Sequence, residues 1–364
     1  MNGDTLSLIV QIAWLILFVL ILTGFNQKIQ MKIWVADIRM KLNFIRSIVE
    51  EDRRKVRSML MNLGLQAPEV LVDRLMEFFT IDPVAVEPVD IIKRMDHLIR
   101  TSDSTVKGLV ESNLKHIGRY ERSLVETSIM IVGALYMLYK VVRHYLLIGE
   151  KENNWVLIMQ LQMLMPQILR YVNAYHEAFE AFSTGKPIGD GVGPLIAYRL
   201  IEMGEKVSSK VLDETSVSEI RYKDRRIFVV KAEGPGSNVG HPGAVISKLV
   251  EELNGGVDLI ITVDAALKLE GEATGSLAEG VGAAIGDPGP EKIAIERAAS
   301  KYGIPLRALV VKMELREAIT TMRKEIFDSV EAALKYIDKL IEENTKPNST
   351  VLVAGIGNTM GIPG

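Results

Sequence analysis

The apolar and polar positions of the chain follow three successive patterns. Residues 6–25 form one apolar run without a charge, which matches the roughly 20 residues that span the hydrocarbon core of a membrane. Residues 27–184 repeat apolar positions at helical spacing, as at Ile45, Ile48 and Val49, and this predicts amphipathic helices. After Gly185, glycine becomes frequent and short β-branched runs appear, which predicts strands.

These patterns predict a transmembrane anchor at residues 1–26, an all-α middle domain at 27–184 and an α/β domain at 185–364. In the last part, short apolar segments alternate with amphipathic ones, which is typical of a mainly parallel sheet covered by helices. The strands are predicted at residues 217–222, 227–231, 259–263, 306–311 and 351–354, and the helices at 192–203, 243–253, 290–302 and 315–343.

The first apolar run predicts a single membrane span rather than a cleaved signal peptide. Asp4 precedes it without any Lys or Arg, the run is longer than a signal core, and no small-residue cleavage pattern follows. Basic residues come directly after it: Lys28, Lys32, Arg39, Lys41 and Arg46. The positive-inside rule then places the amino end outside the cell membrane and the bulk of the protein in the cytoplasm.

A second apolar segment, at residues 128–139, is short for a span. It predicts a buried helix, and a re-entrant or membrane-touching helix is the alternative. No strand is predicted anywhere in the middle domain.

The composition excludes several classes of function. The net charge is only −3 and no cluster of Lys and Arg is interleaved with aromatic residues, so nucleic acid is not an expected partner. The sequence has no cysteine, which excludes disulfides, thiolate metal sites and a cysteine nucleophile. No pattern identifies a cofactor.

In an open α/β sheet, ligands bind beyond the carboxyl ends of the strands, where loops and helix N-termini converge. Four predicted strands lead to charged or glycine-rich positions there: Glu233, Asp264, Lys312 and the terminal segment GIGNTMGIPG. Residues 265–289 form a long segment of irregular composition, and such loops are uncommon unless they are functional or disordered. We expect this segment to cover the site as a lid.

Two further patterns are weak. Residues 234–243 precede a helix as a phosphate-binding loop would, but they lack both the P-loop lysine and the spacing GxGxxG, so an ordinary strand-to-helix turn is favoured. His176 and Glu180 lie four residues apart, a spacing that metal ligands use. A solvated charged face is favoured there because no second pair completes a site, and no metal site is predicted.

Asp190 and Asp264 are the candidate catalytic residues. Asp190 lies in a glycine turn that runs directly into a predicted helix, and Asp264 follows a predicted strand. Two carboxylates held close together cannot both ionise easily, so one keeps a proton and the pair can act as acid and base on a water. On residue types alone, the alternative that Asp190 caps the helix and Asp264 caps a turn is favoured.

Four short segments after Gly185 resemble known proteases. GDGVGPLIAYRLIE resembles the acidic turn and helix of hydrogenase maturation endopeptidases and spore germination proteases, and VLVAGIGNTMG resembles their first strand and its GxGN loop. IITVDAALKLEGEATGSL is similar to their later strand ending in Asp-Ala, and GIPLRALVVKMELREAI to the segment after the lid in germination proteases. The resemblance maps the functional acids of these families to Asp190 and Asp264.

The order of the segments departs from those families, in which the GxGN strand runs directly into the acidic turn. The resemblance therefore implies a circular permutation, with Gly364 close to residues 185–187 and residues 351–354 as an inner strand. The maturation endopeptidases also use a histidine as a metal ligand. Because His241 follows a different strand, the resemblance does not establish metal binding here.

Together these expectations describe a membrane-anchored, peptidase-like hydrolase in which Asp190 and Asp264 activate water on a protein or peptide substrate. Four residues would position the substrate carbonyl: Gly191, Gly193, Gly357 and Asn358. The alternative is a non-catalytic binding module that holds a small anionic ligand or a protein tail through backbone N–H groups and Lys312. As a whole, the chain resembles an archaeal family of membrane proteins with a domain of unknown function, a likeness that implies no activity.

Overall fold

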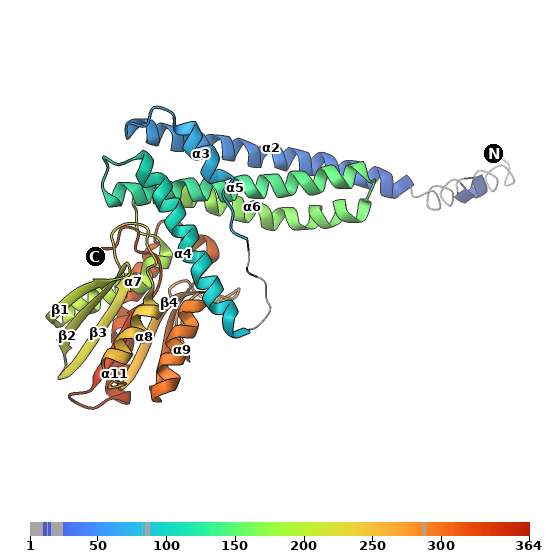
Figure 1. Cartoon of the computed structure of the whole chain (residues 1–364). Coiled ribbons are helices and arrows are strands. Elements are labelled where there is room, and N and C mark those ends of the chain that lie inside the picture. Colours follow the sequence, from blue (N-terminus) through green and yellow to red (C-terminus); the bar gives the residue numbers. More distant parts are fainter. Residues whose placement is uncertain (1–9, 13, 16–24, 82, 84–87, 287–288) are drawn as a thin grey trace. The chain divides into compact units, whose positions relative to one another are not determined.

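The computed structural model describes residues 10–12, 14–15, 25–81, 83, 88–286 and 289–364. Most of the predicted membrane span at residues 6–25 lies outside the described residues. The chain divides into two compact units, one with residues 1–52 and 134–173 and the other with residues 53–133 and 174–364. The division passes through three long helices, which are labelled α2, α5 and α6 in Figure 1.

The first unit consists of parts of α2 (Phe25–Asn62), α5 (Arg119–Lys151) and α6 (Trp155–Ser183). In α2 the buried side chains of Ile38, Leu42 and Ile45 recur at helical spacing, so one apolar stripe packs inward. Between α5 and α6 the chain turns tightly, and Asn154 Oδ1 accepts the N–H of Leu157 at 3.1 Å.

Helix α5 contains residues 128–139, for which a buried helix is predicted. Ile129, Val132 and Leu135 are buried, whereas Met130 and Met137 are exposed. Among the described residues, α5 is the one helix that is long and apolar enough to cross a membrane by length and composition. The buried and membrane-touching interpretations of this segment both stay predictions.

The second unit contains α3 (Pro68–Met76), α4 (Pro88–Asn113) and the first half of α5, together with the whole α/β part. Ion pairs connect these helices to the turns of the sheet. Arg100 and Lys107 of α4 pair with Asp213 and Glu214, and Arg119 of α5 pairs with Glu233.

A mixed sheet forms the centre of the second unit. Its strands are β1 (Glu205–Leu212), β2 (Thr215–Tyr222), β3 (Arg225–Ala232), β4 (Leu259–Leu267), β5 (Leu277–Val281), β6 (Leu306–Met313) and β7 (Thr350–Gly355). They lie in the order β1-β2-β3-β7-β4-β6-β5. The inner strands β3, β7, β4 and β6 are parallel, and the outer strands pair antiparallel.

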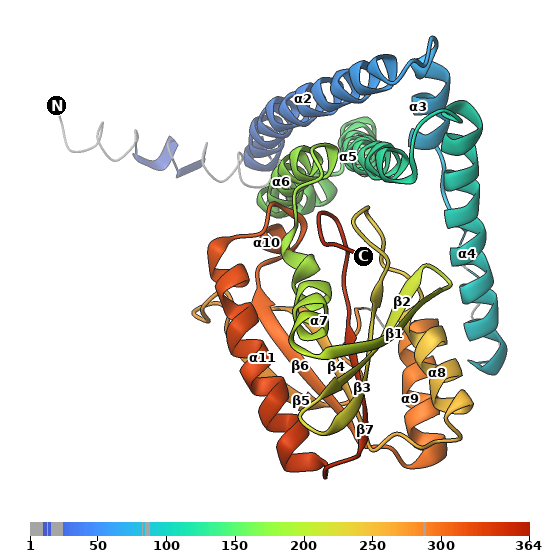
Figure 2. The ribbon, with the colours of Figure 1, turned by 90° about the vertical axis from the view of Figure 1, so that its left-hand side faces the viewer.

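Helices cover both faces of this sheet. One face packs against α7 (Val192–Met203) and α11 (Lys324–Asn344), and the other against α8 (Pro242–Glu252) and α9 (Pro290–Tyr302), as Figure 2 shows. In β3, Val229 belongs to the first core, and Phe228 and Val230 belong to the second. Burial on both faces explains why the inner strands are continuous apolar runs.

The α/β class is confirmed, and all five predicted strands are present, but the sheet is mixed and not mainly parallel, because the edge strands pair antiparallel. Helices at residues 192–203, 243–253 and 290–302 also form, within one residue of the predicted bounds. The sequence patterns did not predict β1 and β5, which lie at the edges of the sheet and are largely exposed. Part of the predicted lid is therefore strand, because β4 continues to Leu267 and β5 lies within residues 265–289.

The single helix predicted at residues 315–343 is wrong. The chain forms α10 (Leu315–Ile319), leaves the helical conformation, and resumes as α11 at Lys324. In the break, Thr321 forms a β-bridge with Ile188, and the Met322 N–H donates to Pro187 O at 2.7 Å. The break therefore holds the turn that carries Asp190.

Candidate active site

Asp190 lies in a short 3-10 turn, η1 (Gly189–Gly191), directly before α7. The helix-capping interpretation of this residue is wrong, because the N-cap of α7 is Gly191 and no side chain caps the helix. Instead, Asp190 Oδ2 accepts the N–H of Asn358 at 2.8 Å. The carboxylate thus joins the acidic turn to the loop that follows β7.

The segment after β7 folds back over the acidic turn. A Cβ atom on Gly361 would lie 2.7 Å from the nitrogen of Pro187 and 2.9 Å from Gly185 O. The expected approach of the terminal segment to residues 185–187 is therefore made by Gly361, whereas Gly364 lies beside Gly234. β7 is an inner strand between β3 and β4, as the sequence analysis requires.

Asp264 lies within β4, opposite Val310 of β6, and not in a turn after the strand. Its side chain is only 6% exposed. Oδ1 accepts the N–H of Ala265 at 2.7 Å, and Oδ2 accepts the N–H of Gly286 at 3.1 Å. The segment predicted as a lid therefore supplies a backbone donor to this acid.

The two acids influence each other electrostatically. Burial raises the pKa of the Asp190 carboxyl, and the hydrogen bond from Asn358 opposes this rise. The pKa of Asp264 is raised to about 7, first by burial and second by the negative charge of Asp190. Among the described residues, neither acid forms an ion pair with a basic side chain. Two buried carboxyls without a cation favour a state that holds one proton.

One oxygen of the pair stays open. Asp190 Oδ1 accepts no hydrogen bond from the described residues, and it is not among their fully enclosed polar atoms without a partner. A water molecule or a substrate can therefore reach it.

The glycines of the site allow close packing of backbone. A Cβ atom on Gly193 would lie 2.1 Å from Ile356 O and 2.6 Å from Val263 O, so α7 begins in direct contact with the ends of β7 and β4. A Cβ atom on Gly357 would lie 2.0 Å from Asp190 O. The roles predicted for Gly191, Gly193 and Gly357 in holding a substrate carbonyl stay predictions.

Asn358 and Lys312 already have partners. Asn358 Nδ2 donates to Ser237 Oγ, and its Oδ1 accepts the N–H of Met360, both at 2.9 Å. The Lys312 ammonium forms an ion pair with Glu272 of the predicted lid. Lys312, on which the anionic-ligand alternative depends, is thus paired, and the role predicted for Asn358 in holding a substrate carbonyl stays a prediction.

The glycine-rich loop before α8 is likewise not an open anion cradle. Glu291 Oε2 accepts the N–H groups of Gly243 and Ala244, at 2.6 and 3.1 Å, in the place where a phosphate would bind. Glu291 Oε1 lies 3.2 Å from His241 Nδ1, and this contact raises the pKa of the histidine. The ordinary strand-to-helix turn, favoured from the sequence, fits this arrangement.

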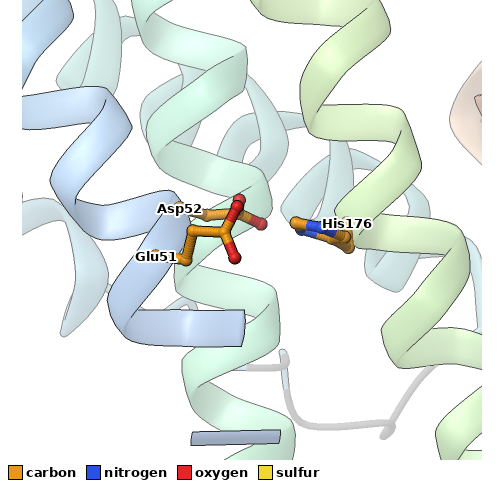
Figure 3. A group of neighbouring side chains, drawn as sticks. All are labelled: Glu51, Asp52 and His176. Atoms are coloured by element: carbon orange, nitrogen blue, oxygen red, sulfur yellow. The ribbon is translucent and has the colours of Figure 1, made fainter. Parts of the chain in front are cut away.

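His176 lies on α6 in the second unit, and Glu51 and Asp52 lie on α2 in the first. Figure 3 shows these three side chains on their helices. Asp52 is fully buried, although nothing in its sequence context marks it. We assign no function to this group.

Sequence reasoning missed Glu126 of α5, which lines two cavities beside the loop after β3. A single acidic residue in an amphipathic helix is common on solvated faces, so its sequence context gives no signal. Its place becomes evident only because α5 packs beside residues 233–241.

Two solved structures are similar to part of the chain. A proteasome-assembly chaperone homologue from Mycobacterium tuberculosis is 12% identical, with 44% of this chain and 83% of that chain covered and a TM-score of 0.31. A PAC2 family protein from Streptomyces avermitilis is 15% identical, with 43% and 82% covered and a TM-score of 0.30. Similarity at this level identifies no function.

No curated protein sequence matches the chain. Residues 12–185 match the N-terminal domain of the DUF1512 protein of unknown function, and residues 188–363 match the C-terminal DUF1512 domain of unknown function. Since the two domains together account for nearly the whole sequence in the expected order, the chain belongs to the DUF1512 family.

Proposed function

We propose that this protein is a peptidase-like hydrolase in which Asp190 and Asp264 share one proton and activate a water molecule. The observation that carries the proposal is the pairing of two acids without a neighbouring cation, in which burial first and the negative charge of Asp190 second raise the pKa of Asp264 to about 7. Perturbed carboxyl pairs of this kind are typical of sites that perform acid–base chemistry.

The chemistry assigns a different role to each acid. Asp264 holds the shared proton, because burial and then the charge of Asp190 raise its pKa, and it donates a hydrogen bond to the substrate carbonyl. The open Oδ1 of Asp190 takes a proton from water as the water oxygen bonds to the carbonyl carbon. The C–N bond of the tetrahedral intermediate then breaks, and the proton on Asp190 passes to the leaving amine.

The choice of a peptide bond is supported by the resemblance to maturation endopeptidases and germination proteases. In this proposal the fold is a circularly permuted form of theirs, with the GxGN loop after β7 meeting the acidic turn through Asn358 and Asp190. The glycine contacts beside Gly193 and Gly357 are consistent with the same close approach of turn and loop.

The non-catalytic alternative has two forms, binding of a small anionic ligand and binding of a protein tail. The contacts of Lys312 with Glu272 and of the first N–H groups of α8 with Glu291 support the small-ligand form less, because these donors already have partners. A protein tail needs no such donors, so tail binding without cleavage remains the second candidate function.

We also propose that residues 6–25 anchor the protein in the cell membrane as a single span. The basic residues that follow this run support an orientation with the amino end outside and the α/β part in the cytoplasm. The substrate is then a cytoplasmic or membrane-associated protein.

The test of hydrolysis uses the full chain in detergent and a proteome-derived peptide pool, with new peptide ends counted by mass spectrometry. The wild type should cleave, and Asp190→Asn and Asp264→Asn should each lower the rate by about 100-fold or more. Asp258→Asn is the matched control, because Asp258 is an exposed acid at the other end of β4 that accepts the N–H of Thr350. If the wild-type protein binds peptides from the pool but cleaves none of them, the result supports the non-catalytic binding module instead.

A further inference from the structure

Two adjoining cavities lie between helices α4 and α5 and the loop after β3. The first has a volume of about 390 Å³ and the second about 370 Å³, within the range of ligand pockets in proteins. Both are lined by Lys107, Glu126, Glu214, Ser237 and Asn238, and we call them together the Glu126 groove. All of its residues belong to the second unit.

Glu126 is the exception among the charges of the first cavity. Arg122 pairs with Glu111, Lys107 with Glu214, and Arg119 with Glu233. The Glu126 carboxylate forms no hydrogen bond or ion pair with any described residue. The cavity therefore contains one carboxylate whose charge no basic side chain of the described chain neutralises by contact.

The surroundings of Glu126 make this unpaired charge unfavourable. The side chain is half-buried, and burial raises its pKa to about 7. Lys107 and Arg122 lower the pKa from a distance, and Glu214 and Glu111 raise it, so the neighbouring charges largely oppose one another. A cation that entered the groove would supply the missing contact.

One lining residue of the groove also contacts a candidate catalytic acid. The second cavity is lined by Asn358, and the N–H of this residue binds Asp190. An extended ligand that lies along the groove from Glu126 thus reaches the loop that holds the acidic turn. Asp103 lines the same cavity without an ion pair, and burial raises the pKa of its carboxyl, but the residue as a whole is more exposed than Glu126.

The residues around Glu126 favour an organic cation over a metal ion as the bound partner. Among the described residues, Glu126 belongs to no group of three side chains that could hold a metal. Lysine and arginine side chains need only one carboxylate, and their apolar stems fit beside side chains such as Tyr120 and Met130, which also line the groove.

We propose that the Glu126 groove binds a lysine or arginine side chain of the peptide substrate, with the Glu126 carboxylate as its counter-ion. This proposal rests on the proposed peptidase function and adds the class of substrate, which is a basic peptide. It also assigns to α4 and α5 the selection of the substrate that the α/β part cleaves.

The test measures binding to the full chain in detergent, in an Asp264→Asn background that prevents cleavage. The probes are a blocked five-residue peptide with lysine at its centre and the same peptide with norleucine, which keeps the carbon stem and removes the charge. The lysine peptide should bind about tenfold more tightly than the norleucine peptide, because one charge-assisted contact distinguishes them. Adding Glu126→Gln should make the two peptides bind equally.

Glu121→Gln is the matched control, since Glu121 lies exposed on the same helix, outside the residues that line the groove. It should leave the tenfold preference intact, and circular dichroism checks that both variants fold. Three results would overturn the proposal. The two peptides could bind equally well to the Asp264→Asn protein that keeps Glu126, the lysine preference could survive Glu126→Gln, or neither peptide could bind at millimolar concentration. If the lysine peptide is preferred but the wild-type protein cleaves no peptide, only the proposed hydrolase function is refuted and the groove proposal stands.

Discussion

Asp190 has the sequence position of a helix cap. Its carboxylate instead accepts the N–H of Asn358, which lies 168 residues further along the chain. Residue type identified both acids as candidates, together with the glycine turn around Asp190 and the predicted strand before Asp264. Their coupling could not be derived in the same way, because it depends on desolvation by elements distant in sequence. The sequence pattern also did not predict that Asp264 is buried inside β4, because an aspartate after an apolar run usually marks the end of a strand.

The raised pKa of Asp264 predicts a pH dependence of stability. In the folded protein this pKa is about 7, above the value of 3.8 expected for an unperturbed Asp, so ionisation of Asp264 opposes folding. The resulting destabilisation is absent below about pH 4, grows as the pH rises toward 7, and is fully present above it. Thermal unfolding midpoints of the wild type should therefore fall more steeply between pH 4 and 7 than those of Asp264→Asn.

The asparagine of Asp264→Asn loses one of the hydrogen bonds that Asp264 accepts from Ala265 and Gly286, which shifts the midpoint at every pH. The comparison therefore uses the slope of the midpoint against pH, which this loss does not change. Asp258→Asn removes an exposed carboxyl and should keep the wild-type slope. Parallel curves for the wild type and Asp264→Asn would show that Asp264 ionises normally in the folded protein.

At the scale of the elements, the start of α7 fixes the site against the sheet. Gly193 lies where any side chain would meet the carbonyl oxygens of Ile356 and Val263, and these atoms belong to backbone that cannot rotate away. Gly193→Ala should therefore lower the free energy of unfolding by about 1–3 kcal/mol, as overpacking does in other cores. It should also reduce hydrolysis, because the acidic turn precedes this glycine directly.

Gly108→Ala is the matched control for this prediction. Gly108 lies in α4, and a Cβ atom there would meet nothing within 4 Å. Alanine at this position should stabilise the chain by up to about 1 kcal/mol through its higher helix propensity. Chemical denaturation measures both variants, and a Gly193→Ala protein as stable as the wild type would contradict the packing described here.

The elements that the sequence predicted are those whose own side chains are buried. The inner strands and α7, α8 and α9 all carry apolar residues at the period of their structure. β1 and β5 form at exposed edges, so backbone pairing rather than their apolar pattern defines them. The break between α10 and α11 depends on the β-bridge of Thr321 with Ile188, a contact that helix periodicity does not encode.

At the scale of the molecule, strand order and chain order differ in a way that concerns function. β7 is the last strand in sequence, yet it lies between β3 and β4, and its following loop holds the acidic turn that opens the α/β part. The second unit also includes α4 and the first half of α5, which line the Glu126 groove beside the loop after β3. Substrate selection and hydrolysis are thus proposed for one unit of the chain.

The absence of cysteine from the sequence makes the proposed membrane topology directly measurable. Asn2→Cys and Lys346→Cys each introduce one thiol, the first before residues 6–25 and the second in an exposed turn between α11 and β7. If residues 6–25 span the membrane with the amino end outside, a membrane-impermeant maleimide should label position 2 in intact cells, and position 346 only after lysis. The charge asymmetry across the apolar run favours this orientation, because Asp4 precedes it and five basic residues follow it within about 21 positions. The cysteine-free wild type controls for background labelling, and labelling of position 346 in intact cells, or recovery of the protein without membranes, would refute the anchor as proposed.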